Sequence, residues 1–341
     1  MNYVRDILTF SAVLITVALS ANTTQANNVV FIILDDVGID RIGAYGYATS
    51  GPTPNIDSLA AGGIRFENAW VNPICSPTRA TLLTGTPPSI HGVIEPINPI
   101  SNAGLITSID NLARTLSENG IRTEAFGKWH LAGDDDTPAH PMEMGFDSHA
   151  GSMANLKHSM TSAEPSDGYD SWEKCINGVC AISTAYPTVD TTDDAIAALT
   201  GTEPFFLWVA YNAAHTPFHD PQNPGAPCPT TNASCHKMMI ETMDEEIGRL
   251  LNAIDFSDTT VMVLGDNGTP PHATEAPFLP DHAKSTVFEG GVNVPFVAGG
   301  VGVGTGIVNC LVHATDFYAT IVDLFGITET LPVYSIRCGS T

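Results

Sequence analysis

The chain has 341 residues, of which 37 are acidic and 13 are basic, and its formal net charge is −24. Such a surface repels phosphate backbones and anionic lipid headgroups, so the composition argues against nucleic acid or a membrane surface as a partner. The length allows a large core and about two domains.

Residues 1–26 have the pattern of a secretory signal peptide. Arg5 precedes a mostly apolar run over residues 7–21, and small residues follow at 24–26, where cleavage is expected. The run is too short to span a bilayer, although an uncleaved N-terminal anchor is the alternative. We therefore expect an exported protein, periplasmic or extracellular, with no membrane attachment after cleavage.

The chain contains seven cysteines. Without Cys75, which is discussed below, an even number remains, and exported proteins with an even number of cysteines usually form disulfides. A zinc site is the competing interpretation, but the local pairs lack the short spacing of a zinc ribbon. The disulfides that we expect are Cys175–Cys180, Cys228–Cys235 and Cys310–Cys338.

Apolar strands alternate with amphipathic helices along the chain, which predicts an α/β fold with a mostly parallel sheet. Pro, Asn and Gly residues mark the expected helix ends, with Asn55 as one N-cap. The polar segment 134–194 is expected to form surface loops. The predicted strands are 28–34, 64–71, 121–126, 205–210, 260–264 and 293–298, and the predicted helices are 55–61, 75–84, 110–118, 236–254 and 314–325.

Acidic side chains follow two of the predicted strands. Asp35 and Asp36 come directly after the first strand, and Asp266 and Asn267 follow a later one. Ligands of α/β sheets gather at the carboxyl ends of strands. Carboxylate and amide oxygens are the ligands that Ca²⁺ or Mg²⁺ prefers, so these residues predict a hard-cation site. Each pair alone could instead cap a helix or form a turn.

The sequence Cys75-Ser-Pro-Thr-Arg79 begins a predicted helix that Gly85 ends. Pro77 suits the first turn, where no backbone N–H is needed, and the helix N-terminus favours an anion. Arg79 lies one turn after Cys75 on the same face. The alternative is a buried or disulfide-bonded cysteine beside a loop.

Four further polar residues follow strands or lie in loops, and together with Arg79 they predict the walls of an anion pocket with proton-transfer groups. Taken singly, the lysines would be interpreted as solvated charges and the histidines as surface residues. These residues are Lys128, His130, His215 and Lys284.

The order of these motifs resembles the type I, formylglycine-dependent sulfatases of the alkaline-phosphatase-like superfamily over nearly the whole mature chain. The pentapeptide Cys-x-Pro-x-Arg is the maturation signature of that family. The other matching segments are 29–36, 46–66 with Thr-Pro-Asn-Ile-Asp-Ser-Leu-Ala, 127–131 with Gly-Lys-Trp-His-Leu, 145–147, 243–250, 266–268 and 284–295.

The resemblance implies a large, mostly parallel mixed sheet sandwiched by helices and the hydrolysis of sulfate esters, with a sulfated carbohydrate as the natural substrate. It implies that a maturation enzyme oxidises Cys75 to formylglycine, whose hydrate is the nucleophile. Ca²⁺, or Mg²⁺ as the alternative, would be bound by Asp35, Asp36, Cys75, Asp266 and Asn267. The catalytic residues would be Cys75, Arg79, Lys128, His130, His215 and Lys284.

The chain departs from the family pattern at a few positions. Ser285 stands where Gly is usual and Asn293 where Arg is frequent. The catalytic domain is expected at 27–326, and 327–341 would be a remnant of a C-terminal subdomain that is reduced or missing. Two alternatives stay open: a phosphonate monoester or phosphodiester hydrolase of the same superfamily, and a non-catalytic module that binds sulfated glycans.

Overall fold

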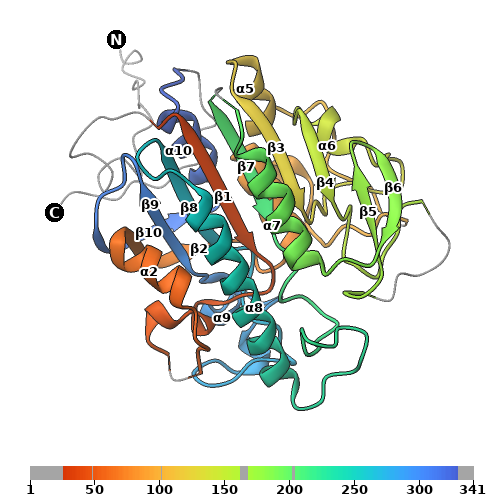
Figure 1. Cartoon of the computed structure of the whole chain (residues 1–341), viewed down its shortest axis with the longest axis vertical. Coiled ribbons are helices and arrows are strands. Elements are labelled where there is room, and N and C mark those ends of the chain that lie inside the picture. Colours follow the sequence, from red (N-terminus) through yellow and green to blue (C-terminus); the bar gives the residue numbers. More distant parts are fainter. Residues whose placement is uncertain (1–25, 48, 101, 162–167, 202–203, 329–341) are drawn as a thin grey trace, which may run out of the picture.

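A computed structural model describes residues 26–47, 49–100, 102–161, 168–201 and 204–328. Ten strands form one mixed sheet in the order β10-β2-β9-β8-β1-β7-β3-β4-β5-β6 (Figure 1). The strands are β1 (Asn28–Leu34), β2 (Ile64–Trp70), β3 (Arg122–Gly127), β4 (Ser148–Gly151), β5 (Trp172–Ile176), β6 (Val179–Ser183), β7 (Phe205–Ala210), β8 (Thr259–Gly265), β9 (Phe296–Gly300) and β10 (Gly306–His313).

The centre of the sheet is parallel. Strand β1 pairs in parallel with both β7 and β8, and β3 continues this pattern towards β4. Only β9 on one side and β5 on the other run against the rest. The predicted α/β class with a mostly parallel mixed sheet is therefore confirmed, and the parallel strands end at one common edge.

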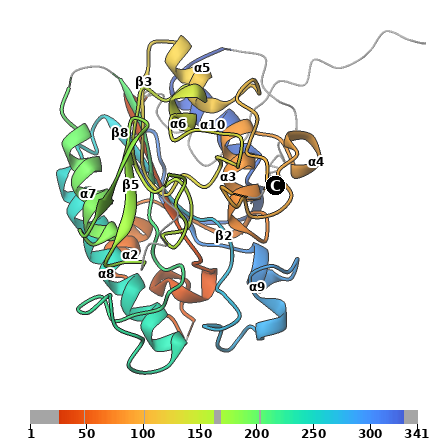
Figure 2. The ribbon, with the colours of Figure 1, turned by 90° about the vertical axis from the view of Figure 1, so that its right-hand side faces the viewer.

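Helices cover both faces of the sheet (Figure 2). On one face lie α2 (Pro54–Gly62), α7 (Pro187–Ala198) and α8 (Asn232–Ala253), and on the other lie α3 (Cys75–Thr84), α5 (Leu112–Glu118) and α10 (Asp316–Leu324). Short helices complete the fold: α4 (Pro88–His91), α6 (His140–Glu143), α9 (Glu289–Val292), η1 (Ile39–Arg41), η2 (Gly43–Tyr45) and η3 (Pro280–His282).

Strand β1 separates two hydrophobic cores. Phe31 and Ile33 belong to the core under α3, α5 and α10, whereas Ile32 and Leu34 belong to the core under α2 and α8. Successive side chains of a strand point to opposite faces, so a strand with helices on both sides must be apolar throughout. This explains the uninterrupted apolar sequence that predicted β1.

Helix α3 is formed as the sequence predicts. It begins at Cys75, carries Pro77 in its first turn and ends where Gly85 adopts φ 65°. This left-handed conformation is open to glycine without steric cost. The helix is buried along its whole length between the sheet and neighbouring elements, so its N-terminus cannot turn towards bulk solvent.

The interpretation of 134–194 as surface loops was wrong. The segment contains α6, α7 and the edge strands β4, β5 and β6. The aspartates that made it look like a loop are neutralised: Lys174 on β5 forms ion pairs of 2.7 Å with Asp190 and 2.6 Å with Asp194 on α7. Pro187 opens this helix at its first position, where proline is tolerated.

Two further predictions about elements need correction. The last predicted strand, 293–298, begins only at Phe296, because Asn293 N donates 2.9 Å to Glu289 O at the end of α9 and Pro295 has no N–H. Strand β10 was not predicted, since it lies at the sheet edge and most of its residues are at least partly exposed, which weakens the hydrophobic pattern.

The two local disulfides are confirmed. Cys175–Cys180 links β5 to β6, and Cys228–Cys235 links a loop to the first turn of α8. Cys338 of the third predicted pair lies outside the described residues, as do residues 1–25 of the predicted signal peptide. Among the helices described, none combines the length and apolar character needed to cross a membrane.

Asn55 does not cap α2, which was predicted. The helix begins after Thr53, and the orphan N–H groups of Asn55 and Ile56 donate to the carboxylate of Asp244 on α8 at 3.0 and 2.9 Å. Asp244 is 1% exposed. A side chain from a distant helix therefore takes the role of the cap.

We expect Asp244→Ala to lower the free energy of unfolding by about 2 kcal/mol, because two buried N–H groups lose their acceptor. The measurement is equilibrium unfolding in urea. Glu245→Ala, an exposed neighbour on the same helix, is the control and should change stability little. Equal effects of the two substitutions would contradict the capping role.

Candidate active site

The ends of two strands, β1 and β8, bring the predicted acidic residues together. Strand β1 lies between β7 and β8, so Asp35 and Asp36 lie beside Asp266: Asp266 N donates to Leu34 O at 2.9 Å, and Asp36 N donates to Asp266 Oδ1 at 3.1 Å. Oxygens of the three carboxylates lie within 4.8 Å of one another. All three side chains are at most 2% exposed, which is costly for carboxylates without compensating charge.

The donor atoms of this group fit a hard divalent cation. Two buried oxygens, Asp35 Oδ1 and Asn267 Oδ1, have no hydrogen-bond partner among the described residues. The amide nitrogen of Asn267 donates 2.9 Å to Asp36 Oδ1, which leaves its carbonyl oxygen available. Oxygen-only donor sets are those of Ca²⁺ and Mg²⁺.

The pKa values report the same concentration of charge. Burial and the neighbouring Asp35 raise the pKa of Asp266 to about 6. Burial alone would also raise the pKa of Asp36, but Lys284, His215 and Lys128 outweigh it and hold that pKa well below its usual range. A bound divalent cation would favour the ionised form of every carboxylate here.

Three cations balance the three carboxylates. Arg79 donates through Nε and Nη2 to Asp266 Oδ2 at 3.0 and 2.8 Å, and through Nη1 to Lys128 O at 2.7 Å. Lys128 Nζ donates to Asp35, and Lys284 Nζ donates to Asp36. A divalent cation would therefore give the site a net positive charge, although the formal net charge of the protein is −24. A positively charged site suits an anionic substrate.

Cys75 lies against a histidine of fixed tautomer. Its Sγ is 3.3 Å from His130 Nδ1, and His130 Nε2 is 2.9 Å from Ile97 O. Because a carbonyl oxygen only accepts, Nε2 carries the hydrogen and the Nδ1 lone pair faces residue 75. Burial and the charge of Lys128 hold the pKa of His130 well below its usual value, so the ring is neutral and can accept a proton.

The thiol itself is poorly suited to nucleophilic attack. Burial raises the pKa of Cys75 although Lys128 and Lys284 oppose this effect, and the thiolate is the reactive form of cysteine. Cys75 is the free cysteine among the described residues. The structure therefore places a free, buried thiol with a raised pKa at the centre of this site.

His215 and Lys284 stand at the mouth of the site. Their side chains are 18% and 13% exposed, whereas the Asp35 and Arg79 side chains are fully buried. His215 Nε2 is 4.0 Å from Asp36 Oδ2, and burial together with Lys128 lowers the pKa of His215 to about 3. The structure thus brings every predicted catalytic and metal-ligating residue into one cluster.

Backbone strain is concentrated here. Asp36, His130 and Ser285 have φ values of 62°, 61° and 74°, a left-handed region that non-glycine residues seldom adopt. Such strain persists where the surrounding structure fixes it, commonly at functional sites. Ser285 occupies the position where glycine was expected, and its positive φ explains why glycine suits that position.

Two supporting residues were missed from the sequence. His236 on α8 is buried, and its Nε2 is 2.9 Å from Asp36 O. Thr269 accepts from Gly38 N at 3.3 Å and donates to Asp40 at 2.8 Å, which joins the loops after β1 and β8. Thr269 follows Asn267 by two residues, and a histidine on the apolar stripe of α8 was the signal for His236.

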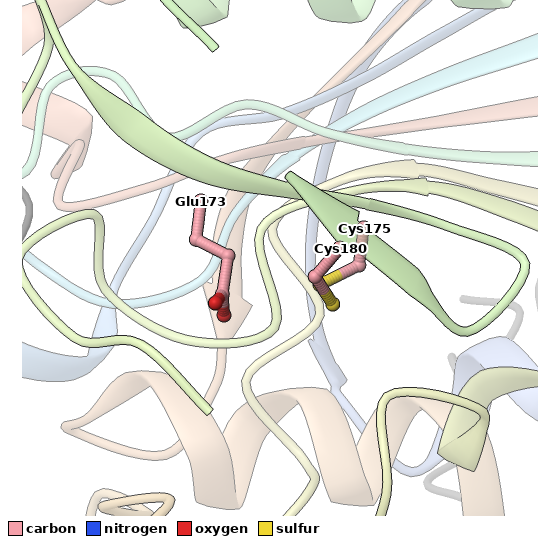
Figure 3. A group of neighbouring side chains, drawn as sticks. All are labelled: Glu173, Cys175 and Cys180. Atoms are coloured by element: carbon pink, nitrogen blue, oxygen red, sulfur yellow. A yellow bond between two sulfur atoms is a disulfide. The ribbon is translucent and has the colours of Figure 1, made fainter. Parts of the chain in front are cut away.

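A second group of potential metal ligands, Glu173, Cys175 and Cys180, does not form a metal site. Figure 3 shows the two sulfurs joined in a disulfide, with the Glu173 side chain beside it, so the sulfurs are not thiolates that could bind a metal. That carboxylate accepts from Ser159 Oγ at 2.6 Å and from Met160 N at 2.9 Å. Its role is to hold the segment after β4.

Carboxylates, cations and histidines thus meet at the carboxyl ends of the parallel strands. The family model described as Sulfatase matches residues 27–327, and the chain belongs to the sulfatase family.

Relatives of known activity match most of this chain. Arylsulfatase J of Mus musculus is 31% identical over 334 residues, which cover 89% of this chain and 53% of the mouse protein. N-acetylgalactosamine-6-sulfatase of Homo sapiens is 29% identical and covers 91% of this chain and 64% of the human protein. This chain therefore spans between half and two thirds of the length of these relatives.

Solved structures agree with the fold. The crystal structure of Ps i-CgsB in complex with k-i-k-neocarrahexaose has a TM-score of 0.76 and 28% identity, and covers 90% of this chain and 73% of its own. The PsFucS1 sulfatase from Pseudoalteromonas sp. has a TM-score of 0.70 and 25% identity, and covers 90% and 69%.

We expect Ca²⁺ to raise the melting temperature of the protein, because a ligand at 100 times its Kd adds about 2.7 kcal/mol to stability. Asn267→Ala removes one unpartnered oxygen and should weaken Ca²⁺ binding measured by calorimetry. Asn252→Ala, an exposed site on α8, should leave binding unchanged. An Asn267→Ala protein with unaltered affinity would rule out this ligand.

Proposed function

We propose that the protein hydrolyses sulfate esters, with formylglycine derived from Cys75 as the nucleophile. The observation that carries this proposal is the environment of Cys75: a free buried thiol at the start of α3, facing the Nδ1 lone pair of His130. The sulfatase family to which the chain belongs uses this position for formylglycine, and two relatives with sulfatase names support the reaction.

In the mature protein, the Sγ position of Cys75 corresponds to a hydroxyl of the aldehyde hydrate. His130 Nδ1 lies at 3.3 Å from that position and is the acceptor for the hydroxyl proton. Arg79, fixed by Asp266 and Lys128 O, orients and polarises the diol from the same helix. The hydroxyl oxygen then attacks sulfur.

The leaving alcohol departs on the side opposite the attacking oxygen. Because Cys75 lies at the buried floor of the site and His215 and Lys284 at its mouth, the leaving oxygen faces these two residues. As the S–O bond to the alcohol breaks, this oxygen takes a proton from His215 or Lys284. His215 must first be protonated, which a bound anionic ester favours.

The sulfated hydrate then collapses without attack of water on sulfur. Its second hydroxyl gives up a proton, the C–O bond to sulfate breaks and the aldehyde is restored. Water adds to the aldehyde to regenerate the diol. His130, after it has passed the first proton to solvent, is placed to accept the proton of the second hydroxyl. A serine in the same position would lack the second hydroxyl and would remain sulfated.

The three cations bind the sulfate group. Lys128 and Lys284, with Arg79 behind them, place three positive charges around the position of the sulfuryl oxygens. Fixed charges of this kind stabilise the transition state without reorganisation. A Ca²⁺ ion held by Asp35, Asp36, Asp266, Asn267 and residue 75 would supply further neutralisation of charge on these oxygens.

The natural substrate that we propose is a sulfated carbohydrate met outside the cytoplasm. The two local disulfides support an oxidising compartment, in line with the predicted signal peptide. The structural relative Ps i-CgsB was solved with k-i-k-neocarrahexaose, which supports a carbohydrate substrate. A maturation enzyme that converts Cys75 is the implied protein partner.

We expect Cys75→Ala to abolish sulfate release while Ca²⁺ still raises the melting temperature. Mass spectrometry of the peptide with residue 75 should detect formylglycine, which is lighter than cysteine, in active wild-type protein. Substantial turnover by the alanine variant would refute the assigned nucleophile. Faster cleavage of an aryl phosphonate than of the matching aryl sulfate would favour the phosphonate hydrolase instead.

We expect Lys128→Ala and Lys284→Ala to lower kcat by roughly 10²- to 10³-fold, the usual effect of removing one electrostatic donor. Their melting temperatures should also fall, since each substitution removes a partner of a buried aspartate, but the variants should stay folded at the assay temperature, so that unfolding does not account for the loss of activity. Lys237→Ala on α8 serves as the control for the loss of a lysine. Parallel loss of stability and activity in both variants would contradict the catalytic role.

A further inference from the structure

Lys157 has no ion-pair or hydrogen-bond partner among the residues that the structure describes. Among the described residues, the other lysines and arginines have a carboxylate within 4.0 Å or, in the case of Arg114, accepting backbone carbonyls. Lys157 is exposed and forms neither kind of contact within that part of the chain. With 37 acidic residues available, an unpaired lysine marks a place where an anion from outside the protein can bind.

The segment that carries Lys157 runs along the candidate site. Trp129 N donates to Ser152 O at 2.9 Å and His130 N donates to Met153 O at 3.0 Å. The segment 152–158 therefore begins beside the residues after β3, where Lys128 and His130 lie. The charge of Lys128 contributes, after burial, to a lowered pKa of His158. Lys157 therefore lies within the electrostatic field of the site.

The end of the Lys157 side chain lies close to the loop that contains His215, because both are next to Gly168. A Cβ atom built on Gly168 would lie 2.9 Å from Pro217 Cγ and 3.8 Å from Lys157 Cε. Pro217 is two residues from His215, and Tyr169 fixes this loop by donating to His215 O at 2.9 Å. Lys157 thus lies near the loop that carries His215, and in the proposed mechanism His215 faces the leaving group.

The segment is held at both ends, so the position of Lys157 is defined. His158 N donates to Asn155 O at 2.7 Å, and Glu173 accepts from Ser159 and Met160 just beyond it. Glu173 lies on β5, whose Cys175 is joined to Cys180 of β6 (Figure 3). The disulfide-linked hairpin therefore supports the segment from the sheet edge.

We infer that Lys157 binds a second anionic group of the substrate, a sulfate or carboxylate on the leaving sugar. This inference rests on the proposed function, because it places the leaving group at His215. An ammonium group on a long side chain suits a charge whose exact position varies. The net charge of −24 repels a long polyanion, so a short anionic unit is the ligand that we infer.

The test compares substrates that differ by one charge. Wild type, Lys157→Ala and Lys157→Arg are purified in the mature form, and sulfate release is measured from 4-nitrophenyl sulfate, a panel of monosaccharide monosulfates, their disulfates and sulfated uronic acids. The Ala variant should lose about tenfold in kcat/KM on one dianionic class, mainly through KM, the effect of about one charge-assisted contact. The Arg variant should retain most of the wild-type kcat/KM on that class.

The controls separate this inference from the proposed function. Lys157→Ala should cleave 4-nitrophenyl sulfate like wild type, and Arg249→Ala, which removes the same charge from α8, should not change the preference. The disulfate and uronic acid arms identify which anion is bound. No Lys157-dependent preference in any pair, with 4-nitrophenyl sulfate still cleaved, overturns this inference alone. A wild type that releases no sulfate at all overturns the proposed function and this inference with it.

Discussion

The buried ion pair between Arg79 and Asp266 is the interaction on which the site depends. It joins the first turns of α3 to the end of β8 through two hydrogen bonds, and a third bond ties the same guanidinium to the backbone after β3. Arginine presents a rigid planar fork that matches a carboxylate. Three separate segments are thereby fixed relative to residue 75, and Arg79→Lys would lose that geometry while keeping the charge.

Burying these charges lowers the stability of the fold, but it also supplies the charged groups that the proposed reaction needs. Three carboxylates with almost no exposure tolerate each other only because cations and, as proposed, a divalent ion neutralise them. The raised pKa of Asp266 and the depressed pKa of Asp36 show how unevenly the charge is shared. Binding of a metal ion and binding of an anion should strengthen each other at this site. The metal ion neutralises the carboxylates, and the anion neutralises the positive charge that then remains.

The sequence predicted the central sheet and the site for the same physical reason. Strand β1 is buried on both faces, so its apolar run is unmistakable, and the parallel arrangement forces Asp35 and Asp266 to one edge. The sheet edges were harder: β10 is largely exposed, and the aspartates of α7 are paired with Lys174, which no local pattern reveals. Likewise, His130 is oriented by Ile97 O, a backbone atom that carries no sequence signal.

The depth of Cys75 has a consequence for the order of events in the cell. Cys75 is 2% exposed and Arg79 is fully buried, so no second protein could bind this pentapeptide once the chain has folded. The proposed oxidation must therefore occur on the nascent or extended polypeptide. After folding, the proposed aldehyde at residue 75 is buried, and an enzyme that acts later could not form it. Whether a given molecule is active therefore depends on a modification that precedes its tertiary structure.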